Sequence, residues 1–275
     1  MIVTVGSDKG SPGATTLAVL LALFWGEERA VCEADPRGAD LPFRMPGADG
    51  RPLAASPSIA TLAVDTRPGA PLRGLELYAQ QTALGVPVVC GEVSSRRFHR
   101  LAAHLPTIAD AAARWSGTLI ADVGCVQAWN PAMVLARASQ AVALVARTDT
   151  ESLGRLRDRV EELAEDVDGG RPQRVPVAVV VRAGRGEARP AVTRAEKLLA
   201  SIGSPVPVLG AVVDDTAAVA ALWAGQVSAR TFRSALFVSV RQITERLREL
   251  CCPAEPTEAV HRVPPAPDRA TVAAP

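Results

Sequence analysis

Short apolar runs recur along the chain and alternate with amphipathic segments. Several of these runs are apolar at consecutive positions and rich in β-branched residues, which is typical of strands buried on both faces of a parallel sheet. The predicted strands are 2–6, 29–35, 86–91, 118–124, 141–147, 175–182 and 206–213. Because helical patterns lie between them, the sequence predicts right-handed βαβ units and a three-layer, doubly wound, mostly parallel α/β sheet.

The clearest helical pattern runs from Leu153 to Leu163, where apolar residues recur at spacings of three and four. A short helix is predicted near 59–64. A second apolar stripe, from Val240 to Leu250, predicts the last helix of the folded unit. Acids and arginines share the polar face of that stripe, which favours packing on the sheet over association with a membrane surface.

The composition changes near residue 250. From Cys252 onward the sequence is rich in proline and alanine and has no apolar periodicity, as in segments that do not form a packed core. We therefore predict one domain over residues 1–250 and a disordered tail over residues 251–275.

Composition and charge place the protein among globular chains. Of its 275 residues, 48% are hydrophobic, enough for a substantial core. The formal net charge of +1 gives no global reason to expect a nucleic-acid partner. The five cysteines form no CxxC pair, and the N-terminal segment has no signal-peptide pattern. These features predict a cytoplasmic protein without a disulfide framework or a zinc site.

The loop "SDKGSPGATTLA" follows the first predicted strand and precedes an apolar helix. In a phosphate-binding loop, glycines allow backbone amides to converge on phosphate oxygens, a lysine contacts the β- and γ-phosphates, and a hydroxyl binds Mg²⁺. The strict pattern GxxxxGK[ST] fails at two positions, because Asp8 replaces the first glycine and Ala14 replaces the lysine. The glycines Gly10 and Gly13, the hydroxyl of Thr15 and the setting between strand and helix remain.

Several segments carry a resemblance to a known family. "KGSPGATT" resembles the deviant Walker A motif KGGxGKTT of the MinD/ParA family of P-loop ATPases, with Lys9 at the position of the signature lysine. "VCEADPRGADL" is similar to the family's DxDPQGN segment, and "TLIADVG" is similar to its Walker B strand. "VPVLGAVVDDTAAVAAL" resembles a late strand, turn and helix. These segments follow the family's order over most of residues 1–250, and they look most like the actinobacterial MinD-like branch.

The resemblance implies a role for each matching residue. Thr15 and Asp122 would hold Mg²⁺, the aspartate through water. Asp35 would position the attacking water, and Lys9 would reach the partner's nucleotide in a sandwich dimer. The residues that would contact ATP are Gly10, Ser11, Gly13, Ala14, Thr15 and Thr16. Taken singly, Asp35 could be an ordinary turn residue and Asp122 could cap a strand end.

Ala14 leaves three functions open. A charge-assisted contact of the missing kind contributes about 1.5–3 kcal/mol, so its loss predicts weaker binding or slower hydrolysis. The first candidate is a weak, dimerising ATPase that uses ATP and Mg²⁺ in positioning, partitioning or assembly of a secretion apparatus. The second is a degenerate pseudo-ATPase that serves as a scaffold or regulatory partner. The third is an interaction protein that uses no nucleotide. The expected partners are a second copy of the chain and a protein cargo or adaptor.

DNA is the less favoured partner. Basic residues occur at 94–100 and at Arg155, Arg157 and Arg159, where they could contact phosphates. Acidic residues dilute the second cluster, so a solvated helix face is the preferred interpretation. Cys32 and Cys125 lie in apolar runs and are interpreted as core thiols.

Overall fold

The computed structural model describes residues 1–10, 13–26, 28–66, 74–168 and 175–252. Its strands are β1 Ile2–Ser7, β2 Arg29–Glu33, β3 Gln80–Gln81, β4 Pro87–Val89, β5 Thr118–Cys125, β6 Ala141–Arg147, β7 Val177–Ala183 and β8 Val208–Val213. They form one eight-stranded sheet with the order β3-β4-β2-β5-β1-β6-β7-β8. The pairing is parallel throughout except between β3 and β4.

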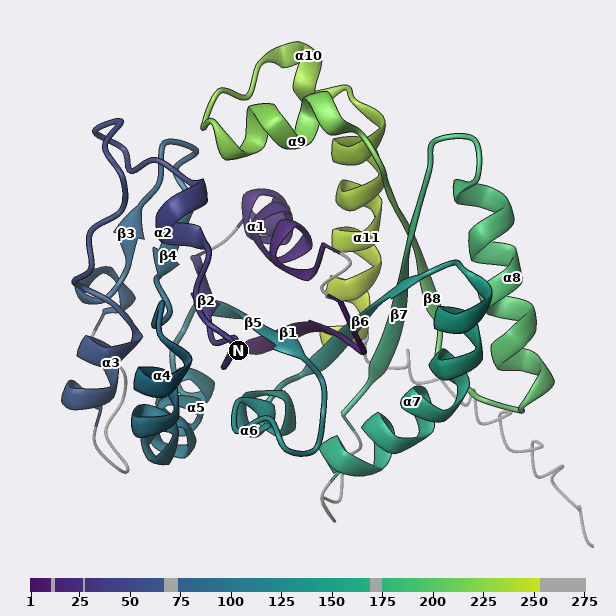
Figure 1. Cartoon of the computed structure of the whole chain (residues 1–275), viewed down its shortest axis with the longest axis horizontal. Coiled ribbons are helices and arrows are strands. Elements are labelled where there is room, and N and C mark those ends of the chain that lie inside the picture. Colours follow the sequence, from purple (N-terminus) through teal and green to yellow (C-terminus); the bar gives the residue numbers. More distant parts are fainter. Residues whose placement is uncertain (11–12, 27, 67–73, 169–174, 253–275) are drawn as a thin grey trace, which may run out of the picture.

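Helices cover both faces of the sheet. They are α1 Ala14–Trp25, α2 Leu41–Arg44, α3 Ile59–Asp65, α4 Ser95–Leu101, α5 Leu105–Ala113, α6 Met133–Arg137, α7 Thr150–Asp168, α8 Ala188–Ser201, α9 Thr216–Trp223, α10 Ala229–Phe232 and α11 Ala235–Cys251, with short 3₁₀ turns at Leu75–Leu77 and Ala102–His104. Helices α1, α9 and α11 pack on one face, and α3 to α8 pack on the other (Figure 1). The chain is thus a three-layer, doubly wound α/β protein, as predicted.

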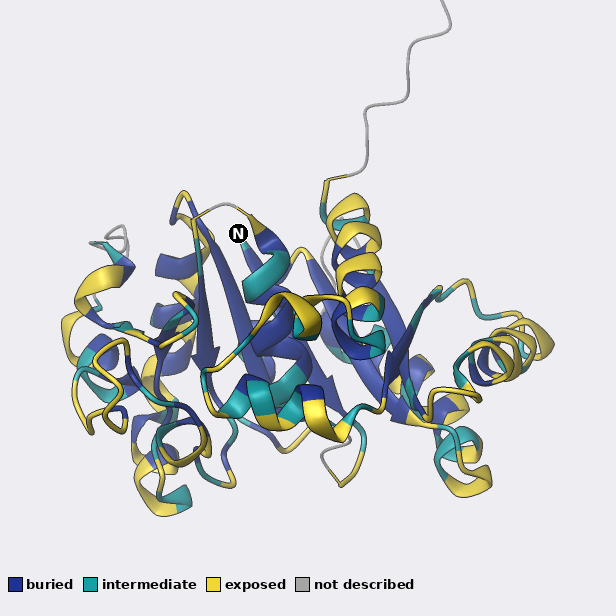
Figure 2. Cartoon of the chain, turned by 90° about the horizontal axis from the view of Figure 1, so that it is seen from above, coloured by how far each residue is buried: buried dark blue, intermediate teal, exposed yellow. Residues whose placement is uncertain are grey.

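The central strands are buried on both sides. Along β1, Val3 and Val5 belong to the apolar cluster that includes α1 and α11, whereas Ile2 belongs to the cluster on the opposite face. All residues of β1 and β5 are buried, and Figure 2 shows exposed residues mainly on the surrounding helices and loops. This two-sided burial explains why the strands are apolar at consecutive positions.

The seven predicted strands are all present, within a few residues at their ends. The edge strand β3 was not predicted, because two glutamines carry no apolar signal. Helices also occur over the predicted ranges near 59–64, 153–163 and 240–250. The last helix continues to Cys251, and residues 253–275 of the predicted tail lie outside the described residues. Within the described part of the chain, no helix is both long enough and apolar enough to cross a membrane.

The strand order places the loop after β1 at the middle of the sheet. Strand β1 lies between β5 and β6, and its chain leaves through α1 toward β2, on the far side of β5. In open α/β sheets, ligands bind beyond the carboxyl ends of the strands where connections diverge in this way. The topology therefore places the expected ligand site at the residues that follow β1, β2 and β5.

Candidate functional site

The loop after β1 leads into helix α1, whose first turn has no side-chain cap from any described residue. Gly10 and Gly13 have φ values of 75° and 99°, a left-handed conformation that favours glycine. Gly13 is the N-cap of α1, and among the described residues no side-chain cap hydrogen bond occurs at this helix end. The first amides of a helix have no partner within the helix, so the start of α1 offers N–H donors and a positive dipole end to an anion. The predicted contact residue Ser11 lies outside the described residues.

Ala14 and the two threonines begin α1 at this point. Ala14 is only 1% exposed and belongs to the apolar cluster on the α1 face of the sheet. Thr15 and Thr16 are partly buried. The first turn of α1 therefore brings one methyl group to the core and two hydroxyl-bearing residues to the edge of the predicted site.

Asp122 is a buried carboxylate with an incomplete set of partners. It lies on β5, level with Val5 of β1 and Glu33 of β2. The residue is 1% exposed; its Oδ1 accepts the Gly124 N–H at 3.1 Å, and no described residue donates a hydrogen bond to Oδ2. A buried polar atom without a partner is costly and uncommon in native structures.

The surroundings of Asp122 suit a hard cation. Burial raises the pKa of Asp122 to about 6, and the charge of Asp35 adds to the rise, while the Thr15 hydroxyl and the Gly124 amide oppose it. A carboxylate oxygen near a threonine hydroxyl is the kind of donor set that Mg²⁺ takes together with water and phosphate. The residues present thus fit a Mg²⁺ ion beside the uncapped start of α1.

Asp35 is brought to the same place but is already bound. Its Oδ1 accepts the Arg37 Nε–H at 3.0 Å and the Arg37 backbone N–H at 2.9 Å, and its Oδ2 accepts from Arg37 Nη2 at 2.7 Å. A Cβ added to Gly124 would lie 2.1 Å from Asp35 Oδ2. Asp35 therefore lies directly against Gly124, near the end of β5. Gly124 is two residues after Asp122 on the same strand. It is both a turn residue and a member of the candidate site.

Arg37 was not predicted as a site residue. Its guanidinium binds both oxygens of Asp35, and its charge is the strongest influence that opposes the burial-induced rise in the pKa of Cys125. The spacing Asp-x-Arg in "ADPRG" was the available signal, since a side chain two residues after a turn aspartate can fold back onto it. The MinD/ParA segment DxDPQGN has glutamine at this position, so the resemblance assigned no role to Arg37.

Asp8, which replaces the first glycine of the strict motif, is tied to α7. Its Oδ1 accepts the Arg159 Nε–H at 2.8 Å and the Gln127 Nε2–H at 3.1 Å, and Arg155 Nε lies 3.3 Å from Oδ2. The Arg159 side chain is only 16% exposed. The interpretation of this basic cluster as a solvated helix face is therefore wrong for Arg159, which neutralises Asp8.

Lys9 is exposed. It lines a small cavity with Asp8, Ser152 and Arg155, at the end of β6 and the start of α7. The candidate site thus unites Thr15, Asp35 and Asp122, whereas Lys9 faces outward.

Glu33 lies next to Asp122 but is fully occupied. Its Oε1 accepts the backbone N–H groups of Asp40 and Leu41 at 2.7 and 3.0 Å, and its Oε2 accepts that of Gly91 at 3.3 Å. Burial raises the pKa of Glu33 to about 7. Its carboxylate anchors the loop after β2 and the end of β4. Cys32 and Cys125 are buried, as predicted for core thiols.

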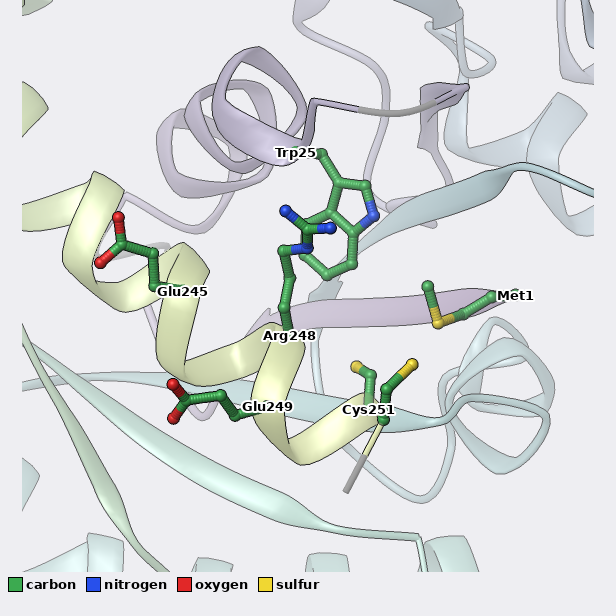
Figure 3. Close-up of a pocket in the computed structure, with 7 residues that line it drawn as sticks. Met1, Trp25, Glu245, Arg248, Glu249 and Cys251 are labelled. Carbon is green, nitrogen blue, oxygen red and sulfur yellow. The ribbon is translucent and has the colours of Figure 1, made fainter. Parts of the chain in front are cut away.

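A separate cavity lies at the other end of the strands, away from the candidate site. It has a volume of about 390 Å³ and is lined by Met1, Trp25, Glu245, Arg248, Glu249, Cys251 and Cys252 (Figure 3). Met1 precedes β1, so this cavity is at the amino ends of the strands. The Arg248 guanidinium lies 5.9 Å from the centre of the Trp25 ring. None of these residues belongs to the candidate site.

Comparison with known proteins supports the fold. No protein-family model matches the chain, and no curated protein matches its sequence. The structure is similar to that of a ParA family ATPase from Chlorobium tepidum TLS, with a TM-score of 0.67 at 15% identity over 90% of this chain and 98% of that one. It is also similar to the septum site-determining protein MinD of Pyrococcus horikoshii OT3 in complex with Mg-ADP, with a TM-score of 0.66 at 15% identity over 91% and 97% of the two chains.

A third similar structure is that of a McdA variant from Cyanothece in complex with ATP. Its TM-score is 0.65 at 12% identity, and the match covers 90% of this chain and 95% of that one. At these identities the likeness establishes the fold. The chain has the MinD/ParA-like P-loop fold that its motifs predicted.

Proposed function

We propose that this protein binds ATP with Mg²⁺ at the loop between β1 and α1. The observation that carries the proposal is Asp122, whose buried Oδ2 has no hydrogen-bond partner among the described residues and lies near the start of an uncapped helix. Proteins of the same fold support the ligand class. Their solved complexes include MinD with Mg-ADP, a McdA variant with ATP, and a plasmid partition protein of Borrelia burgdorferi B31 with AMPPNP.

Each residue of the site has a distinct part in the proposed binding. The first amides of α1, together with the loop glycines Gly10 and Gly13, hold phosphate oxygens. Thr15 and Asp122 hold Mg²⁺, which, when bound, neutralises charge on the phosphates. Asp35 orients a water molecule once its own oxygens are free. Hydrolysis is slow because Ala14 supplies no cation to the β- and γ-phosphates.

We further propose a homodimer in which Lys9 acts on the partner's nucleotide. Its exposure is consistent with a contact made outside its own chain. The dimer would work with a protein cargo or adaptor in positioning, partitioning or assembly. This part rests on the resemblance of the loop sequence to the deviant Walker A motif and on the shared fold.

A scaffold without turnover is the second candidate. Two observations favour it: Ala14 carries no charge, and Arg37 occupies both oxygens of Asp35. A protein with these features could bind nucleotide and keep it intact.

Calorimetric titration of ATP and Mg²⁺, combined with a phosphate-release assay, tests the proposal. The wild type and Ala14→Lys would be compared. Binding by the wild type with phosphate release supports an ATPase, and binding without release supports the scaffold. Binding by Ala14→Lys alone identifies a degenerate site. Binding by neither protein would overturn the proposed function.

A further inference from the structure

We propose that Arg37 supplies the phosphate-binding charge that Ala14 lacks, and that Asp35 holds Arg37 in reserve until a phosphate competes for it. The inference rests on the proposed function and names the cation of that site. The Arg37 guanidinium binds Asp35 at the carboxyl end of β5. The loop of the same site has alanine in place of the phosphate-binding lysine.

Asp35 positions the Arg37 guanidinium. Its Nε and Nη2 atoms bind Asp35, and Asp35 in turn lies against Gly124, so the guanidinium is held at the end of β5. Its charge also acts on Asp122 and Cys125, which belong to the same strand. Arg37 is therefore a cation of the candidate site.

The chemistry of arginine suits this role. A guanidinium offers parallel N–H donors that match a phosphate as well as they match a carboxylate. The Arg37 side chain is 42% exposed and that of Asp35 is 16% exposed. Because the guanidinium is partly exposed, a phosphate group with more negative charge can reach it and compete with Asp35 for its donors.

This exchange would couple binding to the state of Asp35. While the Arg37 guanidinium is bound to both of its oxygens, Asp35 has fewer acceptor positions for a water molecule. When the guanidinium turns to phosphate, these positions become available, and the Arg37 backbone N–H still binds Oδ1. The two residues should therefore have opposite effects on affinity: Asp35 competes with phosphate for Arg37, whereas Arg37 attracts phosphate.

The chain offers a matched control. Asp49 and Arg51 have the same spacing as Asp35 and Arg37 and form an ion pair at 4.0 Å, with the Arg51 side chain 85% exposed. Arg51→Gln removes the same charge from a loop outside the candidate site, so it reports any general effect of net charge on the affinity for ATP.

The experiment is calorimetric titration of the full chain with Mg-ATP and, separately, with adenosine. Arg37→Gln should weaken ATP binding about 10- to 100-fold, the loss expected for one charge-assisted contact, and should leave adenosine binding unchanged. Asp35→Asn should tighten ATP binding severalfold, and Arg51→Gln should leave it unchanged. Arg37→Lys, which keeps the charge and loses the fork, should give an intermediate affinity.

The outcomes separate this inference from the proposed function. If the wild type binds ATP and Arg37→Gln binds it equally well while remaining folded by circular dichroism, the inference is overturned and the proposed function stands. Equal weakening by Asp35→Asn and Arg37→Gln would also overturn it, because the two residues would then act as one structural unit. If the wild type does not bind ATP, the proposed function fails, and the inference fails with it.

Discussion

Glu33 and Asp122 are neighbours on β2 and β5, and they differ in one respect that matters for function. Both are buried, and their Cα atoms are register partners. Glu33 accepts three backbone N–H groups, whereas Asp122 accepts one and leaves Oδ2 without a described partner. Burial of a carboxylate therefore does not by itself mark a binding site. An open acceptor position is the feature that distinguishes Asp122, because a metal ion, a ligand or a water molecule can fill it.

The pKa values alone would not have separated the two residues. Burial is the main cause of the rise in both cases, to about 7 for Glu33 and about 6 for Asp122. A raised pKa often accompanies a functional site, but structural carboxylates also show it. The hydrogen-bond partners distinguish a group that completes the fold from a group that the fold leaves open.

The largest expected effect is the loss of the Glu33 carboxylate. Glu33→Ala would leave the backbone N–H groups of Asp40, Leu41 and Gly91 without their acceptor. Buried unsatisfied donors cost about 1–3 kcal/mol each, so we expect the free energy of unfolding to fall by about 3 kcal/mol or more. Urea denaturation measures this change.

Glu28→Ala is the control for that substitution. Glu28 accepts an exposed hydrogen bond from the Ser116 hydroxyl, so its removal should change stability by no more than about 0.5 kcal/mol. A loss below about 1 kcal/mol for Glu33→Ala would show that Glu33 is not an anchor of the loop.

Asp122→Asn should have the opposite sign. The pKa of Asp122 is raised from 3.8 to about 6 by burial, so the folded wild type holds a proton that the unfolded chain releases between these values. Below about pH 4 the carboxylate is neutral in both states and carries no charge penalty. Between about pH 4 and 6 the unfolded chain has lost this proton while folded Asp122 keeps it, so wild-type stability falls across this window and levels off above about pH 6.

The variant avoids this penalty because asparagine does not ionise. In the absence of ligand, Asp122→Asn should be more stable than the wild type by about 2–3 kcal/mol at pH 8, since one pKa unit corresponds to about 1.4 kcal/mol. The difference should vanish near pH 4. Urea denaturation at the two pH values measures it, with Asp158→Asn on α7 as an exposed control. A variant less stable than the wild type at pH 8 would refute an open carboxylate position.

The smallest expected effect concerns Gly124, which contacts both aspartates of the site. Its φ is +67°, and a Cβ there would overlap the Asp35 carboxylate. Gly26 has a φ of +86° and open space around it. Alanine at either position meets backbone strain of about 1–2 kcal/mol, but Gly124→Ala must also displace Asp35. We expect it to be about 1 kcal/mol more destabilising than Gly26→Ala in urea denaturation. Equal losses would mean that Asp35 moves freely.

Much of the fold was predictable because burial on both sheet faces leaves consecutive apolar residues in the sequence. Asp35 and Asp122 were predicted from the resemblance of their segments to the MinD/ParA motifs, and both lie toward the carboxyl ends of predicted strands, which a parallel sheet brings to one edge. The pairs Asp35 with Arg37 and Asp8 with Arg159 were not predicted. Each pair depends on the conformation of a long arginine side chain. The pair with Arg159 also depends on how α7 packs beside the loop. No local sequence pattern specifies either feature.

The most direct test of the central claim is the titration of ATP into the wild-type protein with and without Mg²⁺. If the free position on Asp122 belongs to a metal-bound phosphate site at the start of α1, the titration gives measurable heat of binding with Mg²⁺. We also expect a markedly weaker affinity when the metal is chelated. The absence of binding under both conditions would contradict the central claim that Asp122 and the loop after β1 form a nucleotide site.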